Sequence, residues 1–549
     1  MYRRVLILIG LSILVLTACA PAAAQAPVTV KETVVVEKQV QVPVTPTPGG
    51  VRKGGTLIVP FTADVNFNSI LASGPNDSYI QAVLFNGLVR YDKQTWQPVP
   101  DLADRWEVSS DGLVWTFYLH KGVKWSDGQP FTADDVKFTY DEGLFDPNVK
   151  TRIKSPYDDV KEIKVVDENT VQFILKQPYA GLAIQLGSYQ FIVPKHILAG
   201  KDMNTDDDFN KRNPVGTGPY KIKEAVPGDH YTVVANDGYF RGRPNIDTII
   251  FKIVPDSNVR IAQLRTGEVD IDSVVPANLP ALADQPNIRF DYLDKIQFYA
   301  IYLNSGRPPF DDRLVRQAMN YGIDRKAIND AVSGGTWTLA TGPIHPGISW
   351  AYNPNLSPIP YDPDKAKALL AQAGWKDTNG DGILEKDGKP FTFNITTDND
   401  PVRNQVAVIA QQYYKKLGLD AKLEVMDWSS LVSKRYFAND YDALSIYQVY
   451  PPDPDMSAMF LSNSTGNRWN YKNPEIDQLL LEGRKESDQT KRQQIYYRVQ
   501  QILGVDDPPM VLLFYPKEIR AYNSALKGLP AKLDYLTSWR YVEEWWLDR

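Results

Sequence analysis

Alternating apolar and polar positions give residues 112–140 a clear local pattern. β-Branched and aromatic residues alternate along Val114–Leu119, which predicts a half-buried strand. Asp127-Gly128 then predicts a turn between two such runs. Thr132 is followed three residues later by Asp135, the spacing of a capping box at a helix start. The stretch therefore predicts strand, turn, strand and helix, in that order.

The same periodicities predict strands and helices along the rest of the chain. Apolar positions at helical spacing predict helices at residues 79–88, 259–265, 314–323, 362–374, 402–416, 476–481 and 491–503. Short runs rich in β-branched residues predict strands at residues 56–59, 163–166, 170–175, 220–224, 231–235, 268–271, 391–396, 420–426 and 511–515. Residues 391–426 form one βαβ unit, so the predicted fold class is α/β.

Length and composition set the broad class of the protein. A chain of 549 residues exceeds what one hydrophobic core supports, so we expect two or three domains. Apolar residues make up 43% and charged residues 23%, which is typical of a soluble globular protein. The net charge of −6 argues against a nucleic-acid binder, which would be basic. Aromatic residues make up 11%, and they either fill large cores or line a binding cleft.

The N-terminal segment carries the features of a bacterial lipoprotein leader. Arg3 and Arg4 precede a short apolar run, and Leu16-Thr17-Ala18-Cys19 matches a lipobox. Cleavage before Cys19 would leave that residue as a lipidated N-terminus, held on a membrane by several acyl chains. The alternative is an ordinary leader with a chance cysteine. Because Cys19 is the only cysteine, the protein has no internal disulfide.

Residues 19–52 predict a disordered tether after a signal peptide of residues 1–18. This segment is rich in Ala, Pro, Thr and Val and has few large apolar residues. Burial of such residues does not offset the cost of ordering the chain, and the prolines favour extended conformations.

Several phrases of the sequence resemble the family 5 extracytoplasmic solute-binding proteins of ABC importers, the group of oligopeptide-, dipeptide- and nickel-binding proteins. Residues 115–136, WTFYLHKGVKWSDGQPFTADDV, are close to that family's signature. Further phrases that resemble the family are GGTL at 54–57, FNGL at 85–88, GTGPY at 216–220, RIAQLRTGEVDI at 260–271 and LVRQAMNYGI at 314–323.

This resemblance implies a fold and a division of the chain into domains. The implied fold is the periplasmic-binding-protein type II fold, with two lobes around a hinge, in the three-domain (cluster C) form. Domain I would comprise residues 53–92, 214–307 and 517–549. Domain II would comprise residues 93–213 and domain III residues 308–516.

The resemblance also implies a role in transport. The protein would capture a solute between its lobes and present it to a membrane permease powered by a cytoplasmic ATPase. We expect a monomer that is extracytoplasmic, in the periplasm or at the cell surface, and lipid-anchored to a membrane. No nucleic acid and no required cofactor are implied.

Enzyme motifs are absent from the sequence. The four histidines, at positions 120, 196, 230 and 345, show no metal-ligand spacing. Residues 347–351 lack the final glycine of a hydrolase nucleophile elbow. Residues 216–218 lack the third glycine of a dinucleotide loop and run into Pro219. We therefore expect no enzyme. A secreted glycan-degrading enzyme, which needs paired carboxylates across a cleft, stays an alternative of another class, as does a chemosensory partner that signals without transport.

The ligand site is inferred from the D-P-D motif at residues 453–455, which resembles the family's. In oligopeptide binders of the family, a Gly-Trp pair and an Asp that takes the peptide's amino terminus precede this motif. Aligning on it places Tyr447 near that Trp and Tyr450 at that Asp. The amino-anchoring carboxylate is then absent, which favours an oligosaccharide, whereas the family favours an oligopeptide. Asp453 is the alternative anchor.

Other residues are candidates for ligand contact, although each could equally pack in a core or at a rim. They are aromatic or amide side chains of the predicted lobes: Phe67, Asn68, Asn304, Trp350, Trp428 and Trp469.

One loop has the spacing of a calcium site. Asp377, Asn379, Asp381 and Glu385 occupy positions 1, 3, 5 and 9 of a calcium loop, with glycine at position 6. Position 12 is Gly388 instead of the usual bidentate Glu. The sequence thus predicts either a structural Ca²⁺ remote from the ligand or a polar turn.

Overall fold

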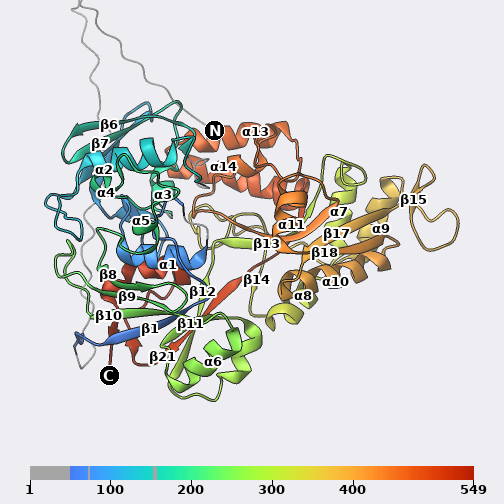
Figure 1. Cartoon of the computed structure of the whole chain (residues 1–549). Helices are drawn as coiled ribbons and strands as arrows, with labels where there is room; N and C mark the ends of the chain where they lie inside the picture. Colours follow the sequence, from blue (N-terminus) through green and yellow to red (C-terminus); the bar gives the residue numbers. More distant parts are fainter. Residues whose placement is uncertain (1–49, 72–73, 152–156, 189) are drawn as a thin grey trace, which may run out of the picture. The chain divides into compact units, whose positions relative to one another are not determined.

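The computed structural model describes residues 50–71, 74–151, 157–188 and 190–549 (Figure 1). The predicted signal peptide, Cys19 and all but the end of the predicted tether lie outside the described residues.

The signature stretch folds as its pattern predicts. Strand β5 (Val114–Leu119) lies in a four-stranded antiparallel sheet between β4 (Ala103–Val108) and β7 (Thr170–Leu175), and β7 also pairs with β6 (Val160–Asp167). Helix α2 (Ala133–Phe138) starts after Thr132, whose N–H donates to Asp135 Oδ2 at 2.9 Å. That bond is the reciprocal half of a capping box.

Two further sheets bring distant parts of the chain together. In one, β1 (Thr56–Phe61) pairs in parallel with β10 (Thr248–Ile253), followed by β9 (His230–Ala235) and β8 (Tyr220–Val226). In the other, β21 (Lys517–Asn523) lies between β11 (Ile271–Val274) and β12 (Ile288–Asp294). The C-terminal part of the chain therefore returns to strands formed some 230 residues earlier.

A six-stranded mixed sheet forms the second half of the fold. Its order is β14 (Thr338–Leu339), β20 (Met510–Tyr515), β13 (Gln297–Leu303), β19 (Ala443–Val449), β17 (Thr392–Asp398) and β18 (Asp420–Met426). The chain passes between this sheet and the β11-β21-β12 sheet twice, at residues 295–296 and at residue 516. The first strand of this sheet along the chain therefore begins at Gln297, and the domain III boundary at residue 308 stays a prediction.

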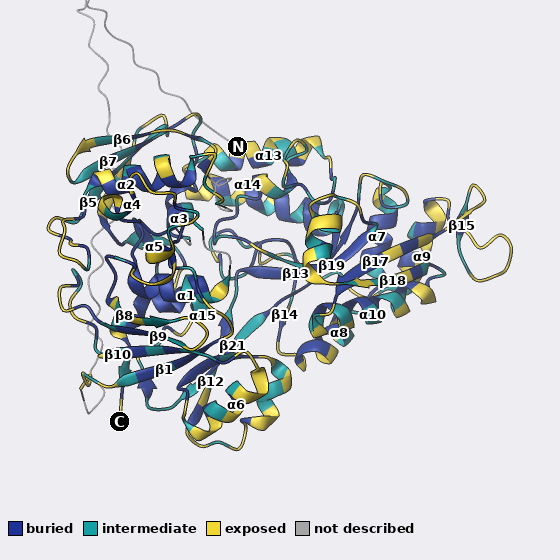
Figure 2. Cartoon of the chain, viewed as in Figure 1, coloured by how far each residue is buried: buried dark blue, intermediate teal, exposed yellow. Residues whose placement is uncertain are grey.

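Helices cover both faces of the six-stranded sheet. All of β13 is buried (Figure 2). Its residues Tyr299, Ile301 and Leu303 pack in one core, with α7 (Arg313–Tyr321), α8 (Arg325–Ser333), α9 (Pro363–Gln372) and α10 (Pro401–Lys416). Its residues Phe298, Ala300 and Tyr302 pack in another core, with α13 (Pro474–Lys485) and α14 (Gln489–Gln501). This three-layer arrangement explains why the strand is apolar throughout.

Further helices and strands complete the described part of the fold. They are β2 (Val89–Tyr91), β3 (Pro98–Pro100), α3 (Leu182–Leu186), α4 (Lys195–Leu198), α5 (Asp207–Lys211), α6 (Ser257–Thr266), β15 (Glu385–Lys386), β16 (Lys389–Pro390), α11 (Trp428–Ser430), α12 (Ser457–Phe460), β22 (Leu526–Lys527), α15 (Tyr535–Ser538) and β23 (Trp546–Leu547).

Helix α1 (Pro75–Leu84) begins and ends four residues earlier than the predicted helix at 79–88. Pro75 starts it because a proline φ suits the first helical turn. The helix ends where the GTGPY segment reaches it, since Gly218 N–H donates to Leu84 O at 2.8 Å. A Cβ on Gly216 would lie 1.9 Å from that same oxygen, so only glycine permits this approach.

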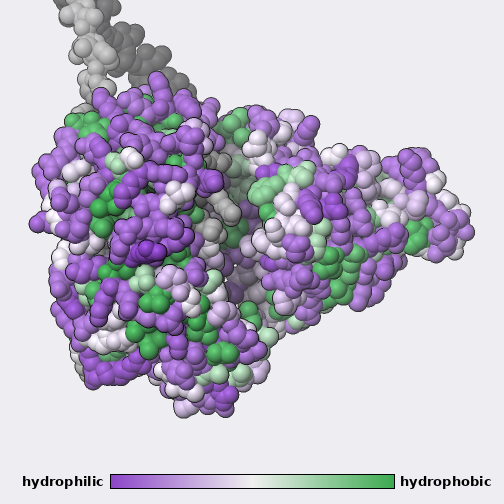
Figure 3. Space-filling view, viewed as in Figure 1, coloured by the Kyte–Doolittle hydropathy of each residue, from purple (hydrophilic) through white to green (hydrophobic). Residues whose placement is uncertain are grey.

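Polar residues dominate the face of the molecule drawn in Figure 3. Figure 3 shows hydrophilic side chains over most of the visible face. No helix within the described ranges is long and apolar enough to cross a membrane.

Candidate functional site

The carboxyl ends of β17, β18 and β19 meet at one edge of the six-stranded sheet, because β17 pairs in parallel with both neighbours. After β17 the chain enters α10, which packs in the core with α7 and α8. After β19 it leads to α13 and α14, which pack in the opposite core. Connections that diverge to opposite faces open a crevice at the strand ends, where α/β proteins bind ligands.

Two predicted site residues lie together at this edge. Trp428 begins α11 directly after β18, and Tyr447 lies near the end of β19. Their rings are parallel, with an interplanar angle of 4° and centroids 6.1 Å apart. Trp428 is 42% exposed, so a flat aromatic surface is open to a ligand.

Arg403 in the first turn of α10 joins these rings. Its guanidinium carbon lies 4.7 Å from the Trp428 ring centroid and 5.2 Å from that of Tyr447. Nε and Nη2 donate to the two oxygens of Asp398 at 2.7 and 2.6 Å. Burial alone would lower the pKa of Arg403, but the bonds to Asp398 and the nearby charge of Asp400 outweigh it and raise the pKa. The arginine is therefore a fixed cation at the strand edge, and we define the edge site as Asp398, Arg403, Trp428 and Tyr447.

Tyr450 is placed differently from its edge-site neighbour Tyr447. Its side chain is buried, and its hydroxyl accepts from His345 N–H and donates to Pro343 O, both at 2.8 Å. Burial raises the pKa of Tyr450 well above its ordinary value. The hydroxyl is thus bonded to the main chain of residues 343–345.

Asp453 is also engaged within the protein. Both of its oxygens accept from Arg492 of α14, at 2.8 and 2.7 Å, and the carboxylate is 3% exposed. In this arrangement the first Asp of the D-P-D motif ties the chain after β19 to α14.

The other predicted ligand residues contact residues outside the edge site. Trp469 is fully buried, with ring centroids 4.4 Å from Tyr302 and 4.6 Å from Phe460. Asn304 donates to Tyr441 O and Asn439 O.

Phe67 packs against Tyr231, and Asn68 donates to Asn210 Oδ1. Trp350 is partly buried, and the guanidinium carbon of Arg492 lies 5.4 Å from the centroid of its ring. The Trp350 Nε1 has no partner among the described residues. Ligand contact at these positions stays a prediction.

Asp398 and Arg403 were missed by the sequence reading. A signal was available, since TTDNDPVR places three charged residues at the junction of a predicted strand and a predicted helix of one βαβ unit. The contact with Trp428 and Tyr447 depends on tertiary packing, so the sequence could have indicated the position but not the partners.

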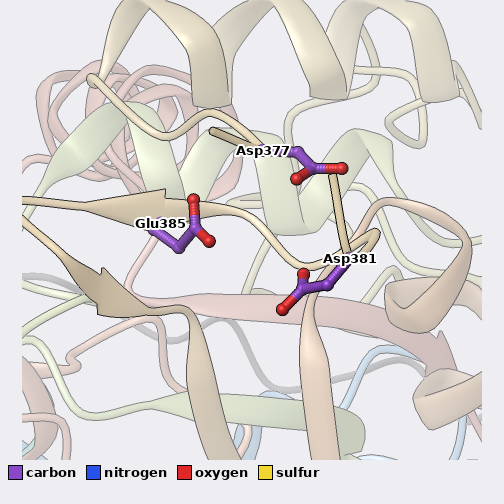
Figure 4. A group of neighbouring side chains, drawn as sticks. All are labelled: Asp377, Asp381 and Glu385. Carbon is purple, nitrogen blue, oxygen red and sulfur yellow. The ribbon is translucent and has the colours of Figure 1, made fainter. Parts of the chain in front are cut away.

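The calcium-like loop lies between α9 and β15. Figure 4 shows Asp377 and Asp381 on the loop and Glu385 on β15. An oxygen of each carboxylate lies within 4.8 Å of the others. Asp377 also accepts from Gly380 N–H and Gly382 N–H, at 2.7 and 3.0 Å. The carboxylates suit Ca²⁺ in donor type, but position 12 offers no side-chain ligand, so the fit is partial.

The layered α/β fold, with aromatic and charged side chains at parallel strand ends, is suited to binding a solute. A family model described as bacterial extracellular solute-binding proteins, family 5 Middle, matches residues 97–470. The chain belongs to this family. The predicted family and the predicted type II fold are confirmed. Members of the family are binding proteins, so the chain is not an enzyme, and the alternative of a glycan-degrading enzyme is wrong.

Individual relatives agree with this assignment. The chain is 32% identical over 512 residues to the oligopeptide-binding protein AppA of Bacillus subtilis, covering 91% of this chain and 93% of that protein. It is 28% identical over 486 residues to the dipeptide-binding protein of Escherichia coli, covering 82% and 89%. The solved structure of AppA from Bacillus subtilis in complex with a nonapeptide has a TM-score of 0.76 and 32% identity, covering 91% of this chain and 100% of that one.

Proposed function

We propose that this protein is the receptor of an ABC importer, which captures an oligopeptide between its lobes and delivers it to a membrane permease. The family supports the receptor role. The relatives named as oligopeptide- and dipeptide-binding proteins, and the solved relative that holds a nonapeptide, support a peptide ligand.

The edge site is the observation that carries this proposal within the molecule. Trp428 and Tyr447 offer aromatic surface, and Arg403 adds a fixed donor, which matches the mostly apolar lining and few placed polar groups of a binding site. Closure of the lobes around the solute would remove water from both surfaces and strengthen these contacts.

An oligosaccharide is the second candidate ligand. In the alignment on the D-P-D motif, Tyr450 takes the position of the amino-anchoring Asp of peptide binders. Its hydroxyl bonds to main-chain groups. The exposed face of Trp428 would stack on a sugar ring as readily as on a peptide side chain.

Thermal unfolding with a ligand panel separates the two candidates. The panel comprises alanine peptides of two to nine residues and maltose-series oligosaccharides. A solute at a hundredfold excess over its Kd stabilises the folded state by about 2.7 kcal/mol. We expect a rise in Tm with peptides. A rise with sugars alone would establish the oligosaccharide receptor, and no rise with either would contradict both.

The lipid anchor at Cys19 is part of the same proposal, although Cys19 lies outside the described residues. Its support is the lipobox at residues 16–19. Mass spectrometry of the mature N-terminus should find acyl chains on Cys19, and Cys19→Ser should release the protein from the membrane fraction. A variant that stays membrane-bound would contradict the anchor.

We also propose a structural calcium ion in the loop of Asp377, Asn379, Asp381 and Glu385. The convergence of the three carboxylates supports it. Such an ion would neutralise their mutual repulsion and would fasten the loop to β15.

A further inference from the structure

One nitrogen of Arg403 is left without a partner in a side chain that is otherwise fully held. Nε and Nη2 donate to Asp398, and Nη2 also lies 3.8 Å from Asp400 Oδ2. Nη1 makes no hydrogen bond to any residue in the described part of the chain. Guanidinium N–H groups are strong donors, so this nitrogen can still donate to a ligand.

A second arginine at the same end of the sheet shows the contrast. Arg435 donates through Nε and Nη2 to Glu424 of β18, as Arg403 does to Asp398 of β17. Its Nη1 donates to Asp440 Oδ2 at 2.9 Å, so all of its nitrogens are paired. Arg435 therefore makes the same two-bond contact with a carboxylate as Arg403, but its third nitrogen also donates within the protein.

The free nitrogen of Arg403 cannot be turned away easily. Asp398 is buried and fixes the plane of the guanidinium, and the rings of Trp428 and Tyr447 lie beside it. The whole residue is only 9% exposed. An arginine that is held in advance in this way loses little side-chain entropy when it forms one more hydrogen bond.

The charges around Arg403 indicate what its free nitrogen would accept. Asp398 already neutralises the guanidinium, and Asp400 adds a second negative charge close by. A ligand carboxylate at this point would meet both aspartates. A neutral oxygen would meet a strong donor without that repulsion.

We infer that Arg403 is a ligand-binding residue whose Nη1 donates to a main-chain carbonyl oxygen of the bound peptide. This inference rests on the proposed function, and it names the ligand group that the edge site binds. A contact with the main chain selects for a peptide backbone but not for any side chain. Trp428 and Tyr447 then act on the adjacent side chain of the ligand.

The test compares arginine variants for peptide affinity by titration calorimetry. The ligand is the panel peptide that raises Tm most, made both as the free acid and as the C-terminal amide. The variants are Arg403→Met and Arg403→Lys, with Arg435→Met as the matched control. Each methionine variant loses a doubly bonded carboxylate partner. Arg403→Met should lower Tm more, because the Asp398 side chain is 4% exposed and that of Glu424 is 31% exposed.

The expected result is a rise in Kd of about tenfold to a hundredfold for both Arg403 variants, equal for the acid and the amide, because one charged-donor hydrogen bond is lost. Arg435→Met should keep the wild-type Kd. Arg403→Lys retains a cation for Asp398 but has no second nitrogen fixed toward the ligand, and it serves if Arg403→Met does not fold.

Three outcomes would overturn the inference, and they are distinguishable. Unchanged affinity in both Arg403 variants would show that the nitrogen does not contact the ligand. A loss of affinity confined to the free-acid peptide would show that Nη1 binds the terminal carboxylate instead of a main-chain carbonyl. Wild-type protein that binds none of the peptides would overturn the proposed function and this inference with it.

Discussion

Asp453 and Arg492 form a buried pair that joins the chain after β19 to helix α14. Two hydrogen bonds of 2.8 and 2.7 Å connect them, and the two side chains are 3% and 6% exposed. Within the described ranges, neither side chain forms another ion pair. The first aspartate of the D-P-D motif thus has a structural partner within the protein.

Asp453→Asn should therefore lower stability more than ligand affinity. Breaking a buried pair leaves Arg492 without its counter-charge, which costs about 3 kcal/mol of unfolding free energy. Urea denaturation measures this loss. Arg498→Met is the control, since Arg498 pairs with Glu475 and Asp506 at the surface and its loss should cost less than about 1 kcal/mol.

The peptide Kd of the same variant decides what Asp453 does. We expect it to stay within about twofold of wild type once the folded fraction is accounted for. A large rise in Kd without a loss of stability would instead make Asp453 the anchor of the ligand.

The strands and helices with strong local signals were predictable. Strand β5 and the start of α2 follow from alternation and from Thr132 and Asp135. The βαβ unit of β17, α10 and β18 follows from period and length. These features depend on residues close in sequence, so local pattern is enough to find them.

Two features depended on packing that the sequence does not display. All seven residues of β13, QFYAIYL, are buried because helices cover both faces of the sheet, so the strand shows no alternation. Arg403 gains its role from Trp428 on α11 and Tyr447 on β19, which both contact it. Only the assembled sheet edge brings these three side chains together.

Trp428→Ala should weaken ligand binding without unfolding the protein. Trp428 is 42% exposed, so its removal costs little core packing. Loss of the stacking surface should raise Kd about tenfold. Phe437→Ala is the control, because Phe437 is 58% exposed and packs beside Tyr436 and Arg468 outside the edge site. Equal effects of the two substitutions on Kd, measured by calorimetry, would argue against the edge site.

Calcium should stabilise the protein through the loop of Asp377, Asp381 and Glu385. We expect millimolar Ca²⁺ to raise Tm by a few degrees and a chelator to reverse the rise. Mg²⁺ should have little effect, because a loop with few ligands does not provide its octahedral geometry. Asp381→Asn should abolish the calcium response while leaving the peptide Kd unchanged. A Tm that is the same with calcium and with chelator would mean that the loop is a polar turn.

Asp534 should make stability fall as pH rises from about 4 to 6. The carboxylate caps α15 by accepting from Thr537 N–H at 2.6 Å. Burial, together with the charge of Glu518, raises the pKa of Asp534 to about 6. The folded protein therefore holds a proton here that the unfolded chain releases near pH 3.9. Because the folded state binds more protons in this window, its stability is lost as pH increases.

Asp534→Asn should remove this loss, since an amide oxygen also accepts from Thr537 N–H and carries no charge. The variant and the wild type should be equally stable below pH 4. The variant should gain about 3 kcal/mol over wild type well above pH 6, as a pKa difference of about two units implies. Burial lowers the pKa of His345 to about 4, which gives the opposite pH dependence. That contribution is common to both proteins and cancels in the difference. Urea unfolding between pH 4 and 8 gives the difference directly, and a difference that does not change with pH would contradict the assignment to Asp534.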